Sequence, residues 1–236
     1  MCLQTNIPLQ ADTGYSALAM KMRAPGEANR AMTLIEVIVV VTVVVVLIAM
    51  LLPALNRAHQ FSGPTCLSNV HEIGTLSLMY AEDNKGQFAI KISITNGGTR
   101  EFIDRNQTFP HYQKLSKYDQ NLRFLVCPDD KTRHVADNYE HLTDNNLSYF
   151  LNADFSTNNP SQSIMAGDRH LQANGTPVRH GTFTVRTNTA LSWTLEMHRG
   201  NGVLGFIDGH AQMSRTNNVN ALFQSQGLAS ARLSVP

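Results

Sequence analysis

Four side chains with metal-binding chemistry occur at suggestive spacing in the C-terminal third of the chain. Nine residues separate His198 from the dipeptide Asp208-Gly209, which His210 follows directly, and Asp168 ends an Ala-Gly-Asp stretch further upstream. Imidazole nitrogens and carboxylate oxygens are common ligands of divalent cations, so convergence of these side chains would make a metal site. The alternative is a polar cluster without metal, because Asp-Gly favours a tight turn by itself. We favour this structural alternative and expect His198 to hydrogen-bond near the turn.

The sequence holds no motif for covalent catalysis or for nucleotide hydrolysis. No Ser, Cys or Thr lies in a recognisable nucleophile motif beside the four side chains, and no Gly-rich phosphate loop leads into Lys-Ser or Lys-Thr. A net charge of +1 with 16% charged residues provides no basic field for nucleic acid. We therefore expect no enzymatic activity, no cofactor beyond a candidate divalent ion, and no nucleic-acid partner.

One apolar run dominates the N-terminal quarter of the chain. Residues 37–52 contain no charge, glycine or proline, and Pro53 ends the run. A helix over residues 32–55 would be about 36 Å long, enough to cross a hydrocarbon core of about 30 Å. A bilayer also forces the many Val, Ile and Thr residues into a helix, because every backbone polar group needs a partner within the segment. The run therefore predicts a single transmembrane helix, which Pro53 bends or loosens at its outer end.

A carboxylate, Glu36, stands at the entrance of this run. A charged carboxylate in a membrane segment costs about 2.5 to 3.5 kcal/mol at a helix centre and less near an end, so it requires a partner. Lys21, Arg23 and Arg30 precede the run and predict a cytoplasmic N-terminus, with the rest of the chain outside. A secretory signal peptide does not fit, because no small-residue cleavage site follows the run. An ordinary single-pass anchor stays open, although it has no need of Glu36.

The start of the run resembles the processing site of type IV pilins and of type II secretion pseudopilins. A small residue, Ala31, precedes the sequence Met-Thr-Leu-Ile-Glu and a long apolar helix. The resemblance implies that a prepilin peptidase cleaves between Ala31 and Met32 and that the new amine of Met32 is methylated. It also implies that this amine pairs with Glu36, on the same or a staggered neighbouring helix. Ala31 stands where the family usually has glycine, and Met32 where it usually has phenylalanine.

Further motifs extend the resemblance, to one bacterial group of pilin-like proteins, over most of the mature chain. They are Cys66-Leu67-Ser68-Asn69, the stretch from Met79 to Gly86, Cys127-Pro128-Asp129, and the motif of His198, nine residues and Asp208-Gly209. The implied partners are prepilin peptidase, other pilin or pseudopilin subunits, an assembly platform and inner-membrane lipid. The implied location is the inner membrane, as a single-pass protein whose C-terminal domain is periplasmic or extracellular, and a filament after assembly.

Two cysteines remain after the implied cleavage, because Cys2 lies in the leader. Cys66 and Cys127 would both lie outside the membrane, where an even pair of cysteines is a candidate disulfide. Two buried thiols are the alternative.

The predicted fold is α+β, with a long N-terminal helix followed by an antiparallel β-sheet domain, as in pilins. The expected parts are a cytoplasmic leader (1–31, or shorter if translation starts at Met20 or Met22), a helix that spans the membrane to about residue 55 and is amphipathic beyond it (32–84), and a β-rich domain (85–236) with the histidine and Asp-Gly motif at 198–209. Gly63-Pro64 predicts a kink or short break in the helix, and Gly86 a left-handed cap after it.

Alternating apolar residues predict the strands of this domain. Phe88, Ile90, Ile92 and Ile94 alternate with more polar residues, and Asn96-Gly97-Gly98 predicts a turn that returns the chain through residues 101–103 as a hairpin. A second hairpin is expected over residues 202–213, with Asp208-Gly209 at its tip. Further expected elements are strands at 122–126, 148–151, 164–166 and 182–186, loops at 106–121 and 128–145, and a short helix or frayed tail after Thr216.

The function that these features favour is that of a pilin-like or pseudopilin subunit, whose helix anchors it and then packs into a filament. A rival is a membrane-anchored extracytoplasmic binding module for a metal or a glycan, which uses the helix for export only. A third candidate, a metal-dependent hydrolase on a stalk, is disfavoured by the missing nucleophile motif. Whether the filament is a pilus, a secretion pseudopilus or an uptake fibre stays open.

Overall fold

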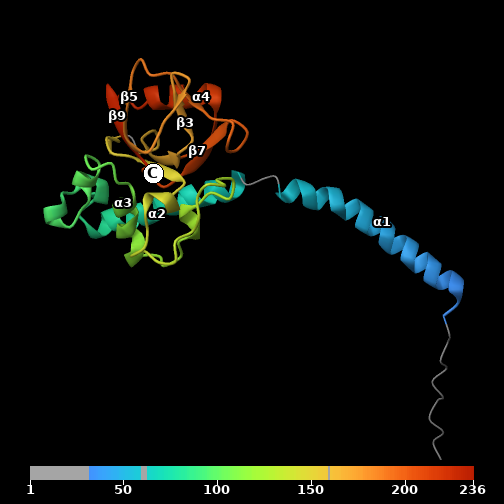
Figure 1. Ribbon diagram of the computed structural model, residues 1–236. Coiled ribbons are helices and arrows are strands. Elements are labelled where there is room, and N and C mark those ends of the chain that lie inside the picture. The colour runs from blue at the N-terminus through green and yellow to red at the C-terminus, as the bar shows by residue number, and fades with distance from the viewer. Residues whose placement is uncertain (1–31, 60–62, 159) are drawn as a thin grey trace, which may run out of the picture. The chain divides into compact units, whose positions relative to one another are not determined.

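The computed structural model describes residues 32–59, 63–158 and 160–236, the side chains of residues 51–59 excepted. The chain divides into two compact units, Met1–Pro53 and Ala54–Pro236 (Figure 1). The expected leader, residues 1–31, lies outside the described residues, and with it Ala31 of the expected cleavage site. One helix supplies most of the described part of the first unit, and all other elements belong to the second.

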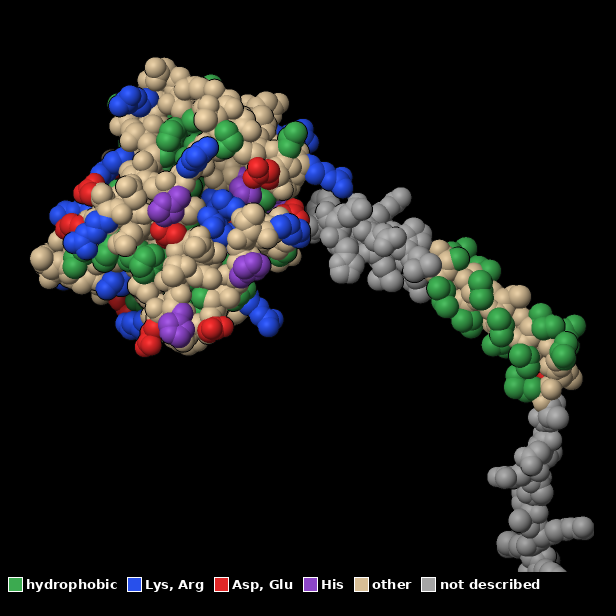
Figure 2. Space-filling model, in the orientation of Figure 1, with side chains coloured by type: hydrophobic (Ala, Val, Ile, Leu, Met, Phe, Trp, Pro, Cys, Tyr) green, Lys and Arg blue, Asp and Glu red, His purple; other side chains and the backbone are tan. Residues whose placement is uncertain are grey.

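The first unit is built on α1 (Leu34–His59), which runs through Pro53. Its side chains from Leu34 to Met50 are exposed in the single chain, and Figure 2 shows them as an apolar surface along the helix. The Thr42 hydroxyl donates to the Val39 carbonyl at 2.8 Å and is thus paired within the helix. Among residues with described side chains, which in α1 end at Met50, no helix is both long and apolar enough to cross a membrane.

The second unit begins with α2 (Gly63–Asp83), a separate helix from α1. Gly63 and Pro64 are the first two residues of α2, a position at which proline is tolerated. The expected left-handed cap is confirmed: Gly86 has a φ of 78° and donates its N–H to the Ala81 carbonyl at 2.7 Å. One face of α2 is buried at a spacing of three and four residues, through Cys66, Val70, Ile73, Leu76 and Tyr80.

A six-stranded antiparallel sheet follows, in the order β5-β9-β1-β2-β7-β8. Its strands are β1 (Tyr149–Asn152), β2 (Ile164–Asp168), β5 (Gly181–Arg186), β7 (Asn201–Phe206), β8 (Ala211–Arg215) and β9 (Ser230–Val235). The expected strands near residues 148–151, 164–166 and 182–186 are confirmed as β1, β2 and β5, and the expected C-terminal hairpin as β7 and β8. The antiparallel β-sheet domain of the predicted fold is therefore present.

Both faces of this sheet are covered (Figure 1). On one face, α2 packs against β2, β7 and β8, where Tyr149 and Leu151 join its core. On the other face, Phe150 and Leu204 pack with Phe223 in a second core. That second layer consists of α4 (Thr216–Gln224) and a three-stranded sheet of β4 (Thr176–Pro177), β3 (Leu171–Ala173) and β6 (Leu191–Trp193). Strands between two cores bury every side chain, which hides the alternation that marks a half-exposed strand.

The hairpin predicted for residues 88–103 is wrong. The segment forms three 3₁₀ turns, η1 (Ala89–Lys91), η2 (Ile94–Asn96) and η3 (Arg100–Phe102). Phe88, Ile90 and Ile92 are buried, but local bonds such as Lys91 N–H to the Phe88 carbonyl pair the backbone. The Thr99 N–H closes the segment by donating to the Ile92 carbonyl at 2.9 Å. Ala89 is buried as well and Ile94 is exposed, so the alternation of apolar residues in the sequence does not correspond to an alternation of burial.

Other elements also differ from expectation. The strand expected at 122–126 is a 3₁₀ turn, η5 (Arg123–Leu125), and the loop expected at 106–121 contains α3 (Phe109–Gln113) and η4 (Lys114–Lys117). The loop at 128–145 leads into η6 (Asp144–Asn146). The short helix that was one alternative after Thr216 is confirmed as α4, but the chain then continues as β9, an unpredicted strand that pairs with both β5 and β1. Two of the six residues of β9 are serines, so its inward Leu233 and Val235 were too few to mark a strand.

Candidate functional site

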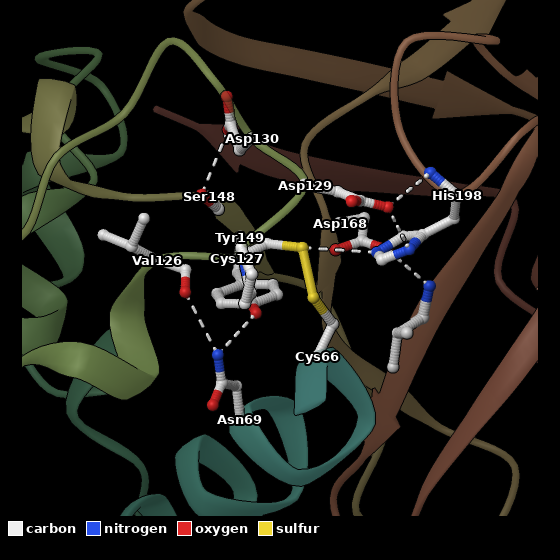
Figure 3. The surroundings of a disulfide bond; sticks show 12 residues. Cys66, Asn69, Val126, Cys127, Asp129, Asp130, Ser148, Tyr149, Asp168 and His198 are labelled. Carbon is white, nitrogen blue, oxygen red and sulfur yellow. Dashed lines mark hydrogen bonds and ion pairs between the residues drawn. A yellow bond between two sulfur atoms is a disulfide. The ribbon is translucent and has the colours of Figure 1, made fainter. Parts of the chain in front are cut away.

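One disulfide ties α2 to the segment that follows η5 (Figure 3). Cys66 and Cys127, the expected pair, are bonded with their Cα atoms 5.5 Å apart, and both are fully buried. Next to the bond, the Asn69 side chain donates to the Val126 carbonyl and to the Tyr149 hydroxyl, both at 3.1 Å. A covalent bond and one hydrogen bond therefore hold α2 to the segment after η5, and a second hydrogen bond links α2 to β1.

His198 lies with its imidazole against this disulfide (Figure 3). Its Nε2 is 3.3 Å from Cys127 Sγ and 3.6 Å from Asp168 Oδ2, and its Nδ1 is 3.1 Å from Asp129 Oδ2. The backbone N–H of His198 also donates to Asp129 Oδ2, at 3.3 Å. Burial lowers the pKa of His198, and the Asp129 carboxylate opposes that shift. The ring thus connects the disulfide to two carboxyl groups.

Asp168, the last residue of β2, is the buried member of that pair of carboxyl groups. Its Oδ2 accepts the Val203 N–H of β7 at 2.7 Å, and its Oδ1 is buried without a hydrogen-bond partner. Removal from water raises the pKa of Asp168 to about 8, against the opposing effect of the Val203 N–H. The carboxyl is therefore mostly protonated at neutral pH, which suits a structural hydrogen bond better than a metal ligand.

The turn that carries His198 has an unusual backbone. His198, Arg199 and Gly200 have φ values of 48°, 55° and 81°, all in the left-handed region. Two residues in a row with a Cβ there are strained, of order 1 kcal/mol each, so other contacts must hold them. The His198 carbonyl supplies one such contact, accepting the Asn201 side-chain amide at 3.0 Å. The contacts of the imidazole with Asp129 and the disulfide supply others.

The other end of the histidine and Asp-Gly motif docks on α2. Asp208 and His210 pair with each other at the tip of the β7–β8 hairpin, with Asp208 Oδ1 2.6 Å from His210 Nδ1. Between them, the Gly209 carbonyl accepts the His71 Nδ1–H of α2 at 2.7 Å. A Cβ on Gly74 would come within 3.1 Å of the Gly209 Cα, so glycine allows the hairpin tip to approach the helix this closely.

The structure therefore separates the four predicted site residues into two pairs. His198 lies beside Asp168, whereas Asp208 lies beside His210. The predicted hydrogen bond of His198 near the Asp208-Gly209 turn is wrong, because the six residues of β7 stand between the two ends. An extended strand of that length spans about 20 Å. The two ends of the motif therefore lie at opposite ends of β7 and do not form one cluster.

Within the described part of the chain, metal-site geometry occurs at Cys66, Cys127 and His198, whose ligand atoms lie within 4.8 Å of one another. Two of these atoms are the sulfurs of the disulfide. Metal ions bind cysteine as the thiolate, a form that a disulfide sulfur does not have. In the disulfide form, these residues do not fit a metal ion.

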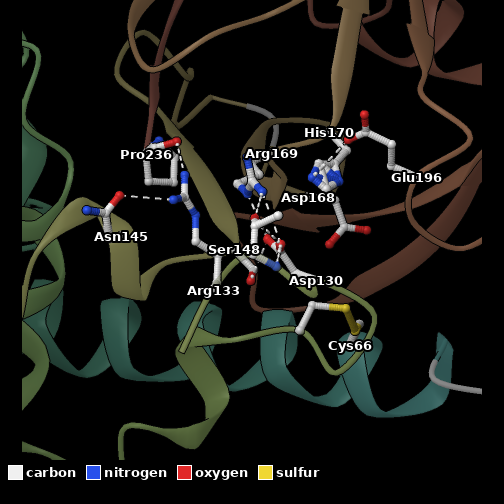
Figure 4. Close-up of polar contacts among 12 residues, drawn as sticks. Cys66, Asp130, Arg133, Asn145, Ser148, Asp168, Arg169, His170, Glu196 and Pro236 are labelled. Carbon is white, nitrogen blue, oxygen red and sulfur yellow. Dashed lines mark hydrogen bonds and ion pairs between the residues drawn. A yellow bond between two sulfur atoms is a disulfide. The ribbon is translucent and has the colours of Figure 1, made fainter. Parts of the chain in front are cut away.

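An ion pair between Asp130 and Arg169, the residues that directly follow Asp129 and Asp168 in the sequence, was not predicted (Figure 4). Arg169 donates from Nε to Asp130 Oδ2 at 2.7 Å and from Nη2 to Asp130 Oδ1 at 3.0 Å. Burial alone would raise the pKa of Asp130, but the hydrogen bonds from Arg169 and Thr132 outweigh it and lower the pKa to about 2. The signal was present: Asp129 and Asp130 directly follow Cys127-Pro128, and Arg169 directly follows Asp168.

Comparison with protein-family models, with curated proteins and with solved structures finds no match to this chain.

Proposed function

We propose that this chain is a pilin-like or pseudopilin subunit. In this proposal a prepilin peptidase cleaves it before Met32, α1 first anchors it in the inner membrane, and α1 then packs with the helices of other subunits in a filament. The second unit (Ala54–Pro236), called the globular unit from here on, stands on the extracytoplasmic side and presents its surface to partners. The work of the chain is assembly and not catalysis.

The observation that carries the proposal is the composition and exposure of α1. From Leu34 to Met50 its side chains are exposed in the single chain, and Glu36 is the one charged residue among them. An apolar surface of this extent does not stay in water, so lipid or other helices must cover it. In the proposal, lipid covers this surface while the subunit is anchored in the membrane, and the helices of other subunits cover it in the filament.

Glu36 accepts hydrogen bonds from Thr33 through one of its two carboxylate oxygens. Its Oε2 accepts the Thr33 N–H at 2.7 Å and the Thr33 hydroxyl at 2.9 Å, as a capping residue does in the first turn of a helix. Both bonds use one oxygen, so Oε1 is left for another donor. The amine that cleavage would create on Met32, or on the Met32 of a neighbouring subunit, is a cation of suitable chemistry.

The disulfide supports an extracytoplasmic place for the globular unit. Structural disulfides form and persist in oxidising compartments such as the periplasm and the cell exterior. The Cys66–Cys127 bond is fully buried and packed against His198. That environment is typical of a permanent crosslink and not of a reactive thiol pair.

A membrane-anchored binding module remains the second candidate. Its metal version loses support, because two of the three converging ligand atoms are bonded to each other as a disulfide. Its glycan version would need a site away from His198 and Asp168, since both are buried.

N-terminal mass spectrometry of the membrane-extracted protein tests the proposal. We expect a mature chain that begins at Met32 and carries a methylated amine when it is made in cells with an active prepilin peptidase. The same chain made in cells without the peptidase is the control, and we expect it to keep its leader. A leader that stays intact in the presence of the peptidase would refute the proposal.

A further inference from the structure

A cleft of about 260 Å³ opens in the globular unit on the far side of Asp130 from the disulfide. It lies where the β2–β3 turn, the segment after β4 and the segment after β6 meet the stretch that follows Cys127. Its chemistry is dominated by cationic and imidazole groups, Arg133, Arg169, Arg179, His170 and His180.

Among the described residues, no side-chain carboxylate forms an ion pair with two guanidinium groups of the cleft, those of Arg133 and Arg179. Arg133 donates from Nη1 to Asn145 Oδ1 at 3.1 Å and from Nη2 to the backbone oxygen of Pro236 at 3.0 Å (Figure 4). Burial lowers the pKa of Arg133 and the nearby charge of Arg169 adds to this shift, whereas the charges of Asp130 and Asp144 oppose it. An anion beside Arg133 would add to the opposing effect of the two carboxylates.

Arg169 also keeps donors for a ligand. Its contacts with Asp130 and Thr132 use Nε and Nη2, which leaves the Nη1 group. A guanidinium is planar and presents its donors as a fork, so an edge that Asp130 does not occupy can bind a second oxyanion.

Three buried polar atoms of residues that line the cleft have no hydrogen-bond partner among the described residues. His170 Nδ1, Thr194 Oγ1 and Arg133 Nε are all buried without a hydrogen bond. Buried polar groups are normally paired, and groups left unpaired at a cleft are the groups that a ligand or ordered water satisfies. Burial holds the pKa of His170 near 4, so at neutral pH its imidazole offers one donor and one acceptor.

The rim carries two acidic groups, each beside a histidine. Asp144 Oδ2 lies 2.8 Å from His180 Nε2, and Glu196 Oε2 lies 3.6 Å from His170 Nε2. Leu171, Pro177 and Val178 give part of the lining an apolar character.

We propose that this cleft binds a small organic oxyanion of about monosaccharide size, with its carboxylate or phosphate group on Arg133, Arg169 and Arg179 and its carbon frame on the apolar part of the lining. The size follows from the cleft volume, which holds one small molecule and not a polymer. The proposal does not depend on filament assembly, because none of these residues belongs to α1.

Isothermal titration calorimetry on the full chain in detergent tests this, with glucuronate, glucose 6-phosphate, inorganic phosphate and uncharged glucose as probes. We expect saturable binding of at least one acidic sugar, weaker binding of inorganic phosphate and none of glucose. Loss of a charge-assisted hydrogen bond in Arg179→Gln or Arg133→Gln weakens binding about tenfold or more. Arg179 is exposed, so its substitution leaves the core intact.

Arg186→Gln is the matched control, because Arg186 is an exposed arginine that lines a different cleft. We expect it to bind like the wild type. The proposal is overturned if no acidic sugar binds, if glucose binds as well as glucuronate, if phosphate binds as tightly as both acidic sugars, or if Arg133→Gln and Arg179→Gln bind like Arg186→Gln.

Discussion

Two carboxyl groups of this chain, those of Asp168 and Glu36, differ in burial and in where their partners are found. Asp168 in the globular unit is buried and bound by Val203 N–H, with the His198 imidazole 3.6 Å away. Glu36 in α1 is exposed, and its contacts with Thr33 occupy one oxygen only. The comparison separates a buried carboxyl, whose contacts come from distant parts of one fold, from an exposed carboxylate, whose described contacts come from its own first helical turn and which, in the proposed function, meets the amine of Met32.

Removal of the disulfide should produce the largest loss of stability in the globular unit. The bond closes a loop with a sequence separation of 61 residues, for which the chain-entropy model gives about 4 kcal/mol. We expect the double variant Cys66→Ala, Cys127→Ala to lose that amount in urea unfolding of the full chain in detergent. The fluorescence of Trp193, which is 3% exposed, reports on the globular unit. An unchanged midpoint would show that the disulfide contributes nothing to the fold.

Substitutions at the two ends of the histidine and Asp-Gly motif should lower the free energy of unfolding by different amounts, as measured by the same urea unfolding. His198→Ala leaves Asp129 and Asp168 without their imidazole, at a loss of about 1 to 3 kcal/mol. His210→Ala removes a partly exposed pair with Asp208 and should cost about 0 to 1 kcal/mol. Equal losses would contradict the separation of the motif into a buried and an exposed end.

The sequence predicts the hairpin of this motif and its candidate residues, but not which of these residues contact one another. The Asp208-Gly209 hairpin was predictable because a tight turn is encoded in two adjacent residues. The partners of His198 were not, because Asp129 is 69 residues away and only the packing of α2 against the sheet brings the two together. The false hairpin at residues 88–103 has a different origin: its apolar residues alternate in the sequence, but the segment folds into 3₁₀ turns that bury the consecutive residues Phe88, Ala89 and Ile90 and expose Ile94.

The pH dependence of stability should distinguish Asp168 from an ordinary carboxyl group. Its pKa is raised to about 8 in the fold, so its stabilising contribution is complete below the unfolded value near 4 and is lost as pH rises toward 8. We expect the stability of Asp168→Asn, relative to the wild type, to increase between pH 5 and pH 8 in urea unfolding. A difference that stays constant over this range would mean that Asp168 is ionised in the fold.

Entry of Glu36→Ala into filaments tests the central claim most directly. The experiment uses cells with an active prepilin peptidase and assembly machinery, and Glu140→Ala, an exposed carboxylate of the globular unit, is the matched control. We expect Glu36→Ala to be processed, to remain extractable from the membrane and to unfold like the wild type, yet to be missing from the sheared filament fraction, which Glu140→Ala enters. Glu36→Ala in filaments at the wild-type level would contradict the account.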